Sequence, residues 1–565
     1  MKTTYLLLTI LFFLQCTAAI SQTKTKSHTL KPSEQVDQLI AKYNIKNGPG
    51  LSVAVIKDGA VVYKKGFGIA NLEYGIPITP STVFQAASVS KQFTVFSILL
   101  LEQDGKLSIE DDIRKYLPEM ADYGHKITLR NLANHTSGIR DNTDLANLLG
   151  ISEADLFSND QAVQLITSQK SLNFIPGDEF EYCNSGFILL AEIVKRVSGK
   201  SFAEFTKERI FEPLKMKNSQ FIDDPEIIVK NSAYSYYKPD TIYYKSILNH
   251  SFVGSTGLNT TAEDLGLWAL NFEKKAIGND PIFNKMKEKS RLNNGEIIPY
   301  ALGQENKIYK GLNVIFHGGG IAGYGSYVLR IPEENFAVVY LCNSQYFHPR
   351  DIAYKIVDYY LAEQENYTEV KPVFNPTLLQ SFVGDYEPFA GLIVSISKEN
   401  ETLFLQSKGD TSKVKLVQSG DYEFIYPNRP HSKIVFGTTK GEAANFFNWH
   451  FSDFSYKGKR VDFKPFDETK MNLNEIVGNY YNSEINTTYR LIIKDNKVVA
   501  THNINADVVL IPLQPDVFVS SYVGFFGKIE IIRNSQSIIT GFYLSGQKIR
   551  RIKFDKVLES SLARN

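Results

Sequence analysis

The stretch Ser88-Val89-Ser90-Lys91-Gln92-Phe93-Thr94-Val95-Phe96 opens a segment of helical periodicity that continues to about Gln103. Apolar residues recur along it at the spacing of one buried helix face. Gly105 follows as a typical helix stop. A buried helix that begins at Ser88 places a hydroxyl group where free backbone N–H groups and the positive end of the helix dipole favour developing negative charge. The stretch therefore predicts both a core helix and a reactive serine.

Lys91 lies three residues after Ser88, on the same face of the predicted helix. A serine hydroxyl is a weak nucleophile unless a base takes its proton, and a neutral lysine can serve as that base. The pattern S-x-x-K is weak evidence by itself, because it also occurs elsewhere, as at Ser235 and Ser545. In isolation, Ser88 would more often be a helix cap and Lys91 a solvated residue of the first turn.

Two further segments complete the inventory of an acyl-transfer site: Tyr182-Cys183-Asn184 and His317-Gly318-Gly319-Gly320. Tyr182 lies in a loop before a helix predicted from a cap near Ser185 to Gly199, where it could move protons together with Lys91. Which of the two is the general base stays open. Asn184 offers a donor and an acceptor to substrate or to Lys91. Alone, the tyrosine could equally be a core residue.

The glycine segment lets a substrate backbone approach closely, because glycine has no Cβ atom. We expect His317, Gly319 and Gly320 to line the substrate site. The backbone N–H groups of Ser88 and Gly320 are the predicted oxyanion hole. A simple loop or bulge is the alternative interpretation of these glycines.

The composition of the chain gives no support to several other classes of function. The chain has 565 residues, 43% of them hydrophobic and 22% charged, which indicates a globular protein of several domains. Its 62 basic and 61 acidic residues give no charge excess that would favour nucleic acid or an anionic membrane. No metal-binding motif occurs, and we expect no metal and no cofactor. The expected partner is a small-molecule or short-peptide substrate, and a homodimer stays open.

The first residues are typical of a signal peptide. Lys2 precedes an apolar run from Tyr5 to Leu14, and small residues follow, so we predict a signal peptide over 1–21 and a secreted or periplasmic protein. Cys16 could carry a lipid anchor, although Gln15 occupies the position where a small residue is expected. No second apolar segment is long enough to span a membrane.

Residues 28–365 are predicted to form one domain. An alternating hairpin over 51–70, with a turn at Asp58-Gly59, and strands near 314–342 enclose a mainly helical segment. This order predicts an α+β fold: an antiparallel sheet whose first and last strands pair, with helices on both faces and an all-helical lobe. A cleft between sheet and lobe would hold the site. Cys183 and Cys342 are expected to be buried free thiols.

The last two hundred residues repeat internally. Phe382-Val383-Gly384-Asp385-Tyr386 recurs as Ile476-Val477-Gly478-Asn479-Tyr480, and alternating segments follow each copy. We predict two small antiparallel β-barrel domains, over 370–468 and 469–560. They could be spacers, or a loop from one of them could reach the catalytic cleft and narrow the substrate range.

The three segments, in this order and spacing, resemble the serine β-lactamase and penicillin-binding-protein superfamily, and its class C-like branch in particular. The stretch 129–138, Leu-Arg-Asn-Leu-Ala-Asn-His-Thr-Ser-Gly, is also similar to that branch. The resemblance covers about 35–365, and the layout of the whole chain is similar to that of D-aminopeptidases with trailing barrels. It implies a catalytic set of Ser88, Lys91 and Tyr182.

The chain departs from that superfamily at the third segment, where Lys-Thr-Gly is usual and this chain has His317-Gly318-Gly319. Histidine is mostly neutral at pH 7 and Gly318 has no hydroxyl, so recognition of a free carboxylate is weakened. We therefore expect an exported serine hydrolase that forms an acyl-Ser88 intermediate on D-amino-acid-containing amides or on esters. The alternatives are a D-alanyl-D-alanine carboxypeptidase or weak β-lactamase, and a catalytically silent envelope sensor.

Overall fold

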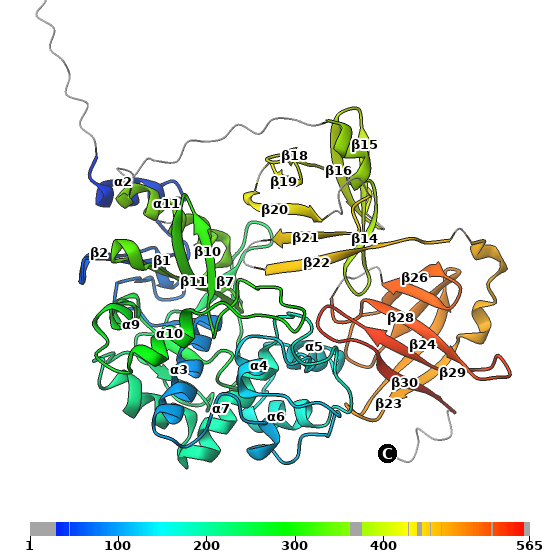
Figure 1. Ribbon diagram of the computed structural model, residues 1–565, viewed down its shortest axis with the longest axis horizontal. Coiled ribbons are helices and arrows are strands. Elements are labelled where there is room, and N and C mark those ends of the chain that lie inside the picture. The colour runs from blue at the N-terminus through cyan, green and yellow to red at the C-terminus, as the bar shows by residue number, and fades with distance from the viewer. Residues whose placement is uncertain are drawn as a thin grey trace, which may run out of the picture.

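The computed structural model describes residues 30–558 except 44–45, 362–375, 409, 428, 438–442, 452–453, 465 and 521–523. The predicted signal peptide and Cys16 lie outside these residues. A large α/β unit is followed by two antiparallel β units, which run from yellow to red in Figure 1. The large unit combines a sheet with a helical lobe, and the last β unit packs beside that lobe.

The central sheet has six antiparallel strands in the order β10-β11-β12-β13-β1-β2. The first and last strands of the domain pair as predicted, with Leu51 opposite Cys342 and Lys57 opposite Phe336. The predicted hairpin is also present, because β1 pairs with β2 across a turn at Asp58-Gly59. The strands are β1 Leu51–Lys57, β2 Ala60–Phe67, β10 Glu305–Tyr309, β11 Leu312–Ile321, β12 Tyr324–Ile331 and β13 Phe336–Cys342.

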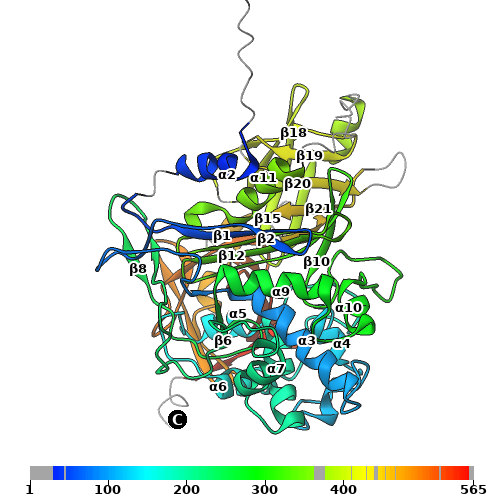
Figure 2. The same ribbon diagram turned by 90° about the vertical axis from the view of Figure 1, so that its left-hand side faces the viewer.

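Helices cover both faces of this sheet, as Figure 2 shows. Residues Leu51, Val53 and Val55 of β1 pack with the helices α2 Pro32–Ala41 and α11 Pro349–Leu361. The intervening residues Ala54 and Ile56 face the opposite side, where α9 Ala262–Lys274 lies. This alternation follows from the two-residue period of a strand and confirms the predicted layers.

The helical lobe is inserted between β2 and β10. Its helices are α3 Ser90–Gln103, α4 Leu129–Ala133, α5 Asn142–Leu148, α6 Asn159–Thr167, α7 Asn184–Ser198, α8 Phe202–Thr206 and α10 Asp280–Lys287. Short strands border it: β3 Ile69–Asn71, β4 Ile76–Pro77, β5 Phe84–Gln85, β6 Gln220–Phe221, β7 Ser235–Tyr237, β8 Tyr244–Ser246 and β9 Leu258–Thr260. Helix α3 is buried along almost its whole length, more completely than one stripe predicts.

Two helix starts differ from prediction. The segment predicted to begin as an α-helix at Ser88 begins as a 3₁₀ turn, Ala87–Val89, and becomes α-helical at Ser90. Ala87 has a φ of +46°, a left-handed conformation that is costly for a residue with a Cβ atom. Helix α7 is capped at Cys183 rather than near Ser185, so Asn184 is its first residue. Its end agrees with prediction, since Gly199 adopts φ +73°.

The two trailing units differ in closure. The first is a nine-stranded antiparallel sheet whose outer strands, β17 and β18, are neighbours in sequence, and the second is a closed eight-stranded barrel. Strands of the first are β14 Gly384–Phe389, β15 Leu392–Glu399, β16 Thr402–Ser407, β17 Val414–Lys415, β18 Val417–Gln418, β19 Glu423–Tyr426, β20 Arg429–Gly437, β21 Phe446–Phe451 and β22 Phe454–Val461. Those of the second are β23 Gly478–Asn482, β24 Thr487–Lys494, β25 Lys497–Thr501, β26 Val508–Gln514, β27 Val517–Ser520, β28 Lys528–Arg533, β29 Ile539–Ser545 and β30 Ile552–Val557.

The internal repeat has a physical basis. The Tyr386 hydroxyl donates to the carbonyl of Phe382 at 2.9 Å, and the Tyr480 hydroxyl donates to the carbonyl of Ile476 at 2.6 Å. In both copies the tyrosine therefore ties the first strand to the turn before it. Within the described ranges, no helix has the length and apolar character that crossing a membrane requires.

Candidate active site

Ser88 lies at the junction of the sheet and the helical lobe, in the 3₁₀ turn that leads into α3. This turn packs against β11 and β12, and the Ser326 hydroxyl of β12 donates to the carbonyl of Ala86 at 2.6 Å. The unusual backbone of Ala87 precedes a serine that is partly exposed, whereas its neighbours Ala87 and Val89 are buried. The fold thus holds a strained turn whose serine is the one partly exposed residue of the three.

The side-chain nitrogen of Lys91 lies at the centre of the site. It lies 3.1 Å from Ser88 Oγ, 2.9 Å from Asn184 Oδ1 and 2.9 Å from the carbonyl oxygen of Ser255. The Lys91 side chain is completely buried. Burial, with the positive charge of Lys548 as the second cause, lowers the pKa of Lys91 well below its ordinary value. Both causes favour the neutral amine more than in an exposed lysine.

These three contacts suit a neutral amine. Such a group has two hydrogens and one lone pair. The carbonyl oxygens of Asn184 and Ser255 accept the hydrogens, because neither oxygen can donate. The lone pair is then directed to Ser88, whose hydroxyl can donate to it. The predicted role of Asn184 in holding Lys91 agrees with this geometry.

Tyr182 comes from the loop before α7 and lies beside both groups. Its ring centroid is 4.8 Å from Lys91 Nζ, and its hydroxyl is hydrogen-bonded to Ser88. Burial raises the pKa of Tyr182 well above its ordinary value, while the Ser88 contact and the charge of Lys548 act in the opposite direction. The phenol is therefore protonated in the resting site. Ser88 and Lys91 from one predicted segment and Tyr182 from another therefore lie together.

The glycine segment belongs to β11 and passes directly over Ser88. A Cβ atom on Gly319 would lie 2.4 Å from Ser326 Oγ, 2.7 Å from the carbonyl of Ala86 and 2.8 Å from the backbone nitrogen of Ser88. Strand β10 pairs only with Leu312 to Phe316, so its ladder ends before these glycines. The segment is a strand edge, as expected, and not a loop. The assignment of the Gly320 N–H to the oxyanion hole stays a prediction.

His317 is buried and fixed at both ring nitrogens. Nδ1 lies 2.6 Å from the carbonyl of Gly318, which can only accept, so Nδ1 carries the hydrogen. Nε2 lies 2.9 Å from the Tyr300 hydroxyl and accepts from it. Burial is the main cause that lowers the pKa of His317 to about 3. The neutral histidine expected from sequence is thus built into the fold.

Several residues of the site were not predicted from sequence. Asp141 accepts from the backbone N–H of Asn184 at 2.6 Å and so holds the start of α7. His135 accepts from the N–H of Cys183 at 3.0 Å, and its ring lies 4.2 Å from that of Tyr182. His135 falls in the 129–138 stretch, which could have indicated it. Lys548 comes from the last barrel, with its ammonium 5.5 Å from the Tyr182 ring, and nothing in the local sequence indicates it.

Cys183 and Cys342 are both buried and free, as predicted. Burial raises the pKa of the Cys183 thiol well above its ordinary value, so this neighbour of Tyr182 is not a thiolate nucleophile. Ser88 is the nucleophile that this arrangement offers.

The fold and the geometry together define a serine-based acyl-transfer site between an antiparallel sheet and a helical lobe. The family profile described as Beta-lactamase matches residues 36–361, which is more than half of the chain. The protein belongs to the Beta-lactamase family.

Individual relatives are similar over parts of the chain. A D-aminopeptidase of Gluconobacter oxydans is 30% identical over 52% of this chain and 56% of its own length. Penicillin-binding protein 4* of Bacillus subtilis is 28% identical over 66% of this chain and 87% of its own. The matched region thus spans little more than half the length of the first D-aminopeptidase. An octameric penicillin-binding protein homologue from Pyrococcus abyssi shares the fold, with 21% identity, a TM-score of 0.53, and coverage of 83% of this chain and 98% of its own.

Proposed function

We propose that the protein is an exported serine hydrolase that cleaves an amide or ester bond through an acyl-Ser88 intermediate. The observation that carries the proposal is the position of Lys91, whose amine lies 3.1 Å from Ser88 Oγ with its other two contacts on carbonyl oxygens. A buried neutral amine at hydrogen-bond distance is the base that a serine nucleophile needs.

In the proposed acylation step, Ser88 Oγ attacks the substrate carbonyl carbon and its proton passes to Lys91 Nζ. The oxyanion of the tetrahedral intermediate is stabilised by the Ser88 N–H and by an N–H of the adjacent glycine strand. Tyr182, protonated in the resting site, gives its proton to the leaving amine or alcohol as the carbon–leaving-group bond breaks. Lys91 then returns the proton to Tyr182. This sequence assigns the base to Lys91 and the acid to Tyr182.

In the deacylation step, water attacks the acyl carbon of the ester formed with Ser88. The same two groups transfer a proton from the water, and Ser88 Oγ leaves and is reprotonated. The substrate carboxyl group is released and the resting site is restored. No group from outside the chain is needed for the proton balance.

The substrate class we propose is an amide or ester of a D-amino acid or a short D-residue peptide. The neutral His317 and the side-chain-free Gly318 and Gly319 support a substrate without a carboxylate at the third segment. Similarity to proteins named D-aminopeptidase supports the same class. Export is supported by the Lys2 and Tyr5–Leu14 pattern.

The test is a substrate panel with wild type and Ser88→Ala. We expect wild type to hydrolyse D-aminoacyl p-nitroanilides faster than their L forms, and short-chain p-nitrophenyl esters as well. We expect Ser88→Ala to lose at least about 10³-fold in kcat/KM, since the covalent route is removed.

The panel also separates the alternatives. Faster turnover of D-Ala-D-Ala peptides or nitrocefin than of D-aminoacyl anilides would favour the carboxypeptidase or weak β-lactamase. A silent sensor would gain no mass from a serine-directed phosphonate. Hydrolysis by Ser88→Ala at the wild-type rate would reject acyl-Ser88 chemistry altogether.

A further inference from the structure

The loop between β29 and β30 of the last barrel reaches the active site. It consists of Gly546 to Arg551 and follows Ser545, the last residue of β29. Ser545-Gly546-Gln547-Lys548 is one of the recurrences of the S-x-x-K pattern. Ser545 is buried, and its hydroxyl accepts from the backbone N–H of Arg551 at 2.9 Å, so it closes the loop and is not a second nucleophile. The lysine of this pattern is the one that lies beside Tyr182.

The loop is held against the catalytic domain by its backbone. The Lys548 N–H donates to Asp144 Oδ2 at 2.8 Å, and its carbonyl accepts from the Asp141 N–H at 3.2 Å and from Asn173 Nδ2 at 2.9 Å. The Arg550 N–H donates to Asn173 Oδ1 at 2.7 Å. These contacts need no side chain from position 548. They fix the position of Lys548, and its ammonium group takes no part in them.

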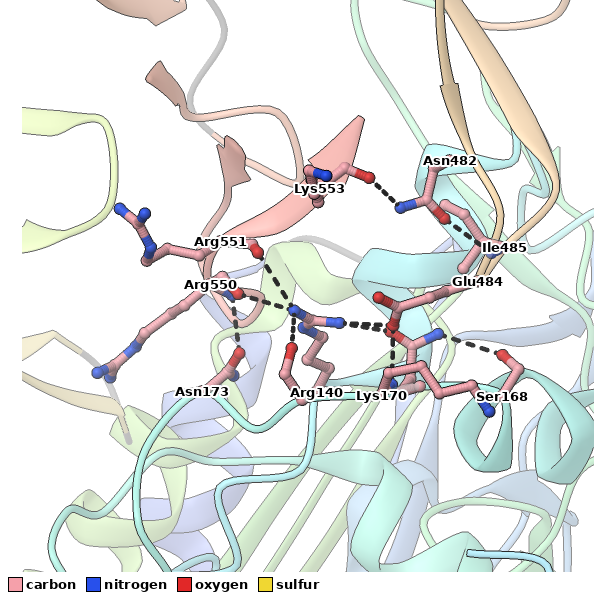
Figure 3. A network of polar contacts seen from close by, with 12 residues as sticks. Arg140, Ser168, Lys170, Asn173, Asn482, Glu484, Ile485, Arg550, Arg551 and Lys553 are labelled. Carbon is pink, nitrogen blue, oxygen red and sulfur yellow. Dashed lines mark hydrogen bonds and ion pairs between the residues drawn. The ribbon is translucent and has the colours of Figure 1, made fainter. Parts of the chain in front are cut away.

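A polar network behind the loop adds to this attachment (Figure 3). Arg140, which is 1% exposed, donates to the carbonyls of Arg550 and Arg551 and pairs with Glu484 of the barrel at 3.0 Å. The Arg550 guanidinium pairs with Glu179 at 3.0 Å and with Glu181 at 2.8 Å. The position of the loop is therefore set by many contacts at once.

The ammonium of Lys548 makes a different kind of contact. It lies 5.5 Å from the Tyr182 ring centroid, and Lys91 Nζ lies 4.8 Å from the same centroid. Among the described residues, no carboxylate lies at ion-pair distance from Lys548 Nζ. Two amine groups therefore flank one phenol. Repulsion between them favours the neutral form of the more deeply buried one, Lys91.

We propose that the last barrel completes the catalytic site: Lys548 supplies beside Tyr182 the positive charge that the neutral His317 cannot supply, and so keeps Lys91 neutral and ready to act as the base. The proposal rests on the proposed function. Lys548 is a positioning residue, because it acts through Lys91 and Tyr182. It also stabilises the phenolate that forms when Tyr182 gives up its proton.

Other charged and titratable groups lie near Lys91, Tyr182 and Lys548 and influence their pKa values. Asp141 and Asp144 raise the pKa of Lys548 although burial opposes its charge, so it stays protonated. Further titratable groups near Lys91, Tyr182 and Lys548 include Cys183, Glu181, Glu305, Tyr456, Tyr300, His135 and His317. The two histidines are held neutral, since burial lowers the pKa of each. Lys548 is therefore the nearby cation that acts on Lys91.

The experiment is the pH dependence of kcat/KM for Lys548→Met with a neutral ester, p-nitrophenyl acetate. Removing the charge of Lys548 raises the pKa of Lys91. Lys91 then stays protonated, and cannot act as the base, up to a higher pH. The acid limb should move to higher pH by about half a unit to one unit, and activity on that limb should fall about three- to tenfold. Lys548→Arg should restore the limb. Lys497→Met, which removes an exposed lysine of the same barrel, should leave the profile unchanged.

Three results would overturn the proposal: an unshifted limb in Lys548→Met, a loss of activity that is equal at all pH values, or an effect seen only with a substrate that carries a carboxylate. The last would make Lys548 a substrate-binding group. Thermal unfolding of each variant checks that the loop is still attached. If Lys548→Met keeps the wild-type profile while Ser88→Ala is inactive, the proposal fails and the serine hydrolase stands.

Discussion

At the scale of single residues, the site depends on protonation states that burial sets. Burial lowers the pKa of Lys91 and raises the pKa of Tyr182, and both shifts favour the neutral form of the group. Both groups contact Ser88. From the sequence, either Lys91 or Tyr182 could be the general base. These protonation preferences favour Lys91 as the base.

Asn184→Asp tests this assignment, because it places a carboxylate where an amide oxygen now lies 2.9 Å from Lys91 Nζ. An opposite charge at this distance stabilises the ammonium, and the pKa of Lys91 rises. We expect the acid limb of kcat/KM to move to higher pH by at least about one unit. The measurement is the pH–rate profile, with Asn184→Ser as a neutral control. A limb that moves to lower pH, or stays in place, would contradict Lys91 as the base.

At the scale of elements, a short turn and a strand edge determine the shape of the site. The 3₁₀ turn Ala87–Val89 lies against β11 so closely that a side chain at position 319 has no room. Two of the three nearest atoms belong to backbone, and backbone cannot move aside as a side chain can. The glycine is therefore a packing requirement of the nucleophile turn itself.

Gly319→Ala is expected to displace either β11 or the Ser88 turn, because its Cβ would lie 2.7 and 2.8 Å from two backbone atoms and 2.4 Å from Ser326 Oγ. We predict a loss of at least about 100-fold in kcat, as expected when catalytic groups shift by about 1 Å. Gly266→Ala is the matched control. Its Cβ would meet Ile56 at 3.6 Å, an ordinary contact, in the interior of α9, so it should keep activity and gain slightly in thermal stability. Unchanged kinetics in Gly319→Ala would reject the close packing described.

At the scale of the whole molecule, the last barrel and the helical lobe share one apolar core. Polar contacts border this interface: the Tyr489 hydroxyl donates to the carbonyl of Leu148 at 3.0 Å, and Arg140 pairs with Glu484. The barrel is therefore not a freely tethered spacer. Of the two interpretations that the sequence left open, the structure agrees with a barrel loop that reaches the catalytic residues, and its effect on the substrate range stays a prediction.

Arg140→Met tests how strongly the barrel is attached. The substitution leaves the mostly buried Glu484 and two loop carbonyls without this partner, and breaking one side of a buried pair costs about 3–5 kcal/mol. We expect a clear drop in the free energy of unfolding and a loss of activity, because the Lys548 loop is released. Arg114→Met is the control: its pairs with Asp112 and Asp122 lie at the surface, partly exposed to solvent, and should contribute far less to the free energy of unfolding. Chemical denaturation followed by fluorescence measures both, and equal losses would contradict this account.

Local pattern was sufficient for much of this architecture. The two-residue and helical periods of the apolar residues predict the strands and the buried α3, because each period selects one backbone geometry. The order of these elements along the chain predicts the pairing of β1 with β13. The recurrence of Phe382–Tyr386 as Ile476–Tyr480 predicts two related β units, because similar patterns of residues adopt similar backbone geometry. Ser88, Lys91, Tyr182, Asn184, His317 and Gly319 were identified because each belongs to a short motif, and the structure brings all six together.

Pattern could not indicate the contacts between segments far apart in the chain. Lys548 lies 366 residues after Tyr182 in a loop with no distinctive composition, and only the docking of the barrel on the lobe places the two side by side. The same holds for the protonation states, since the pKa of Lys91 depends on burial and on charges contributed by other segments. Local sequence specifies backbone preference and reactive groups, whereas desolvation and electrostatic fields arise only when the chain is packed.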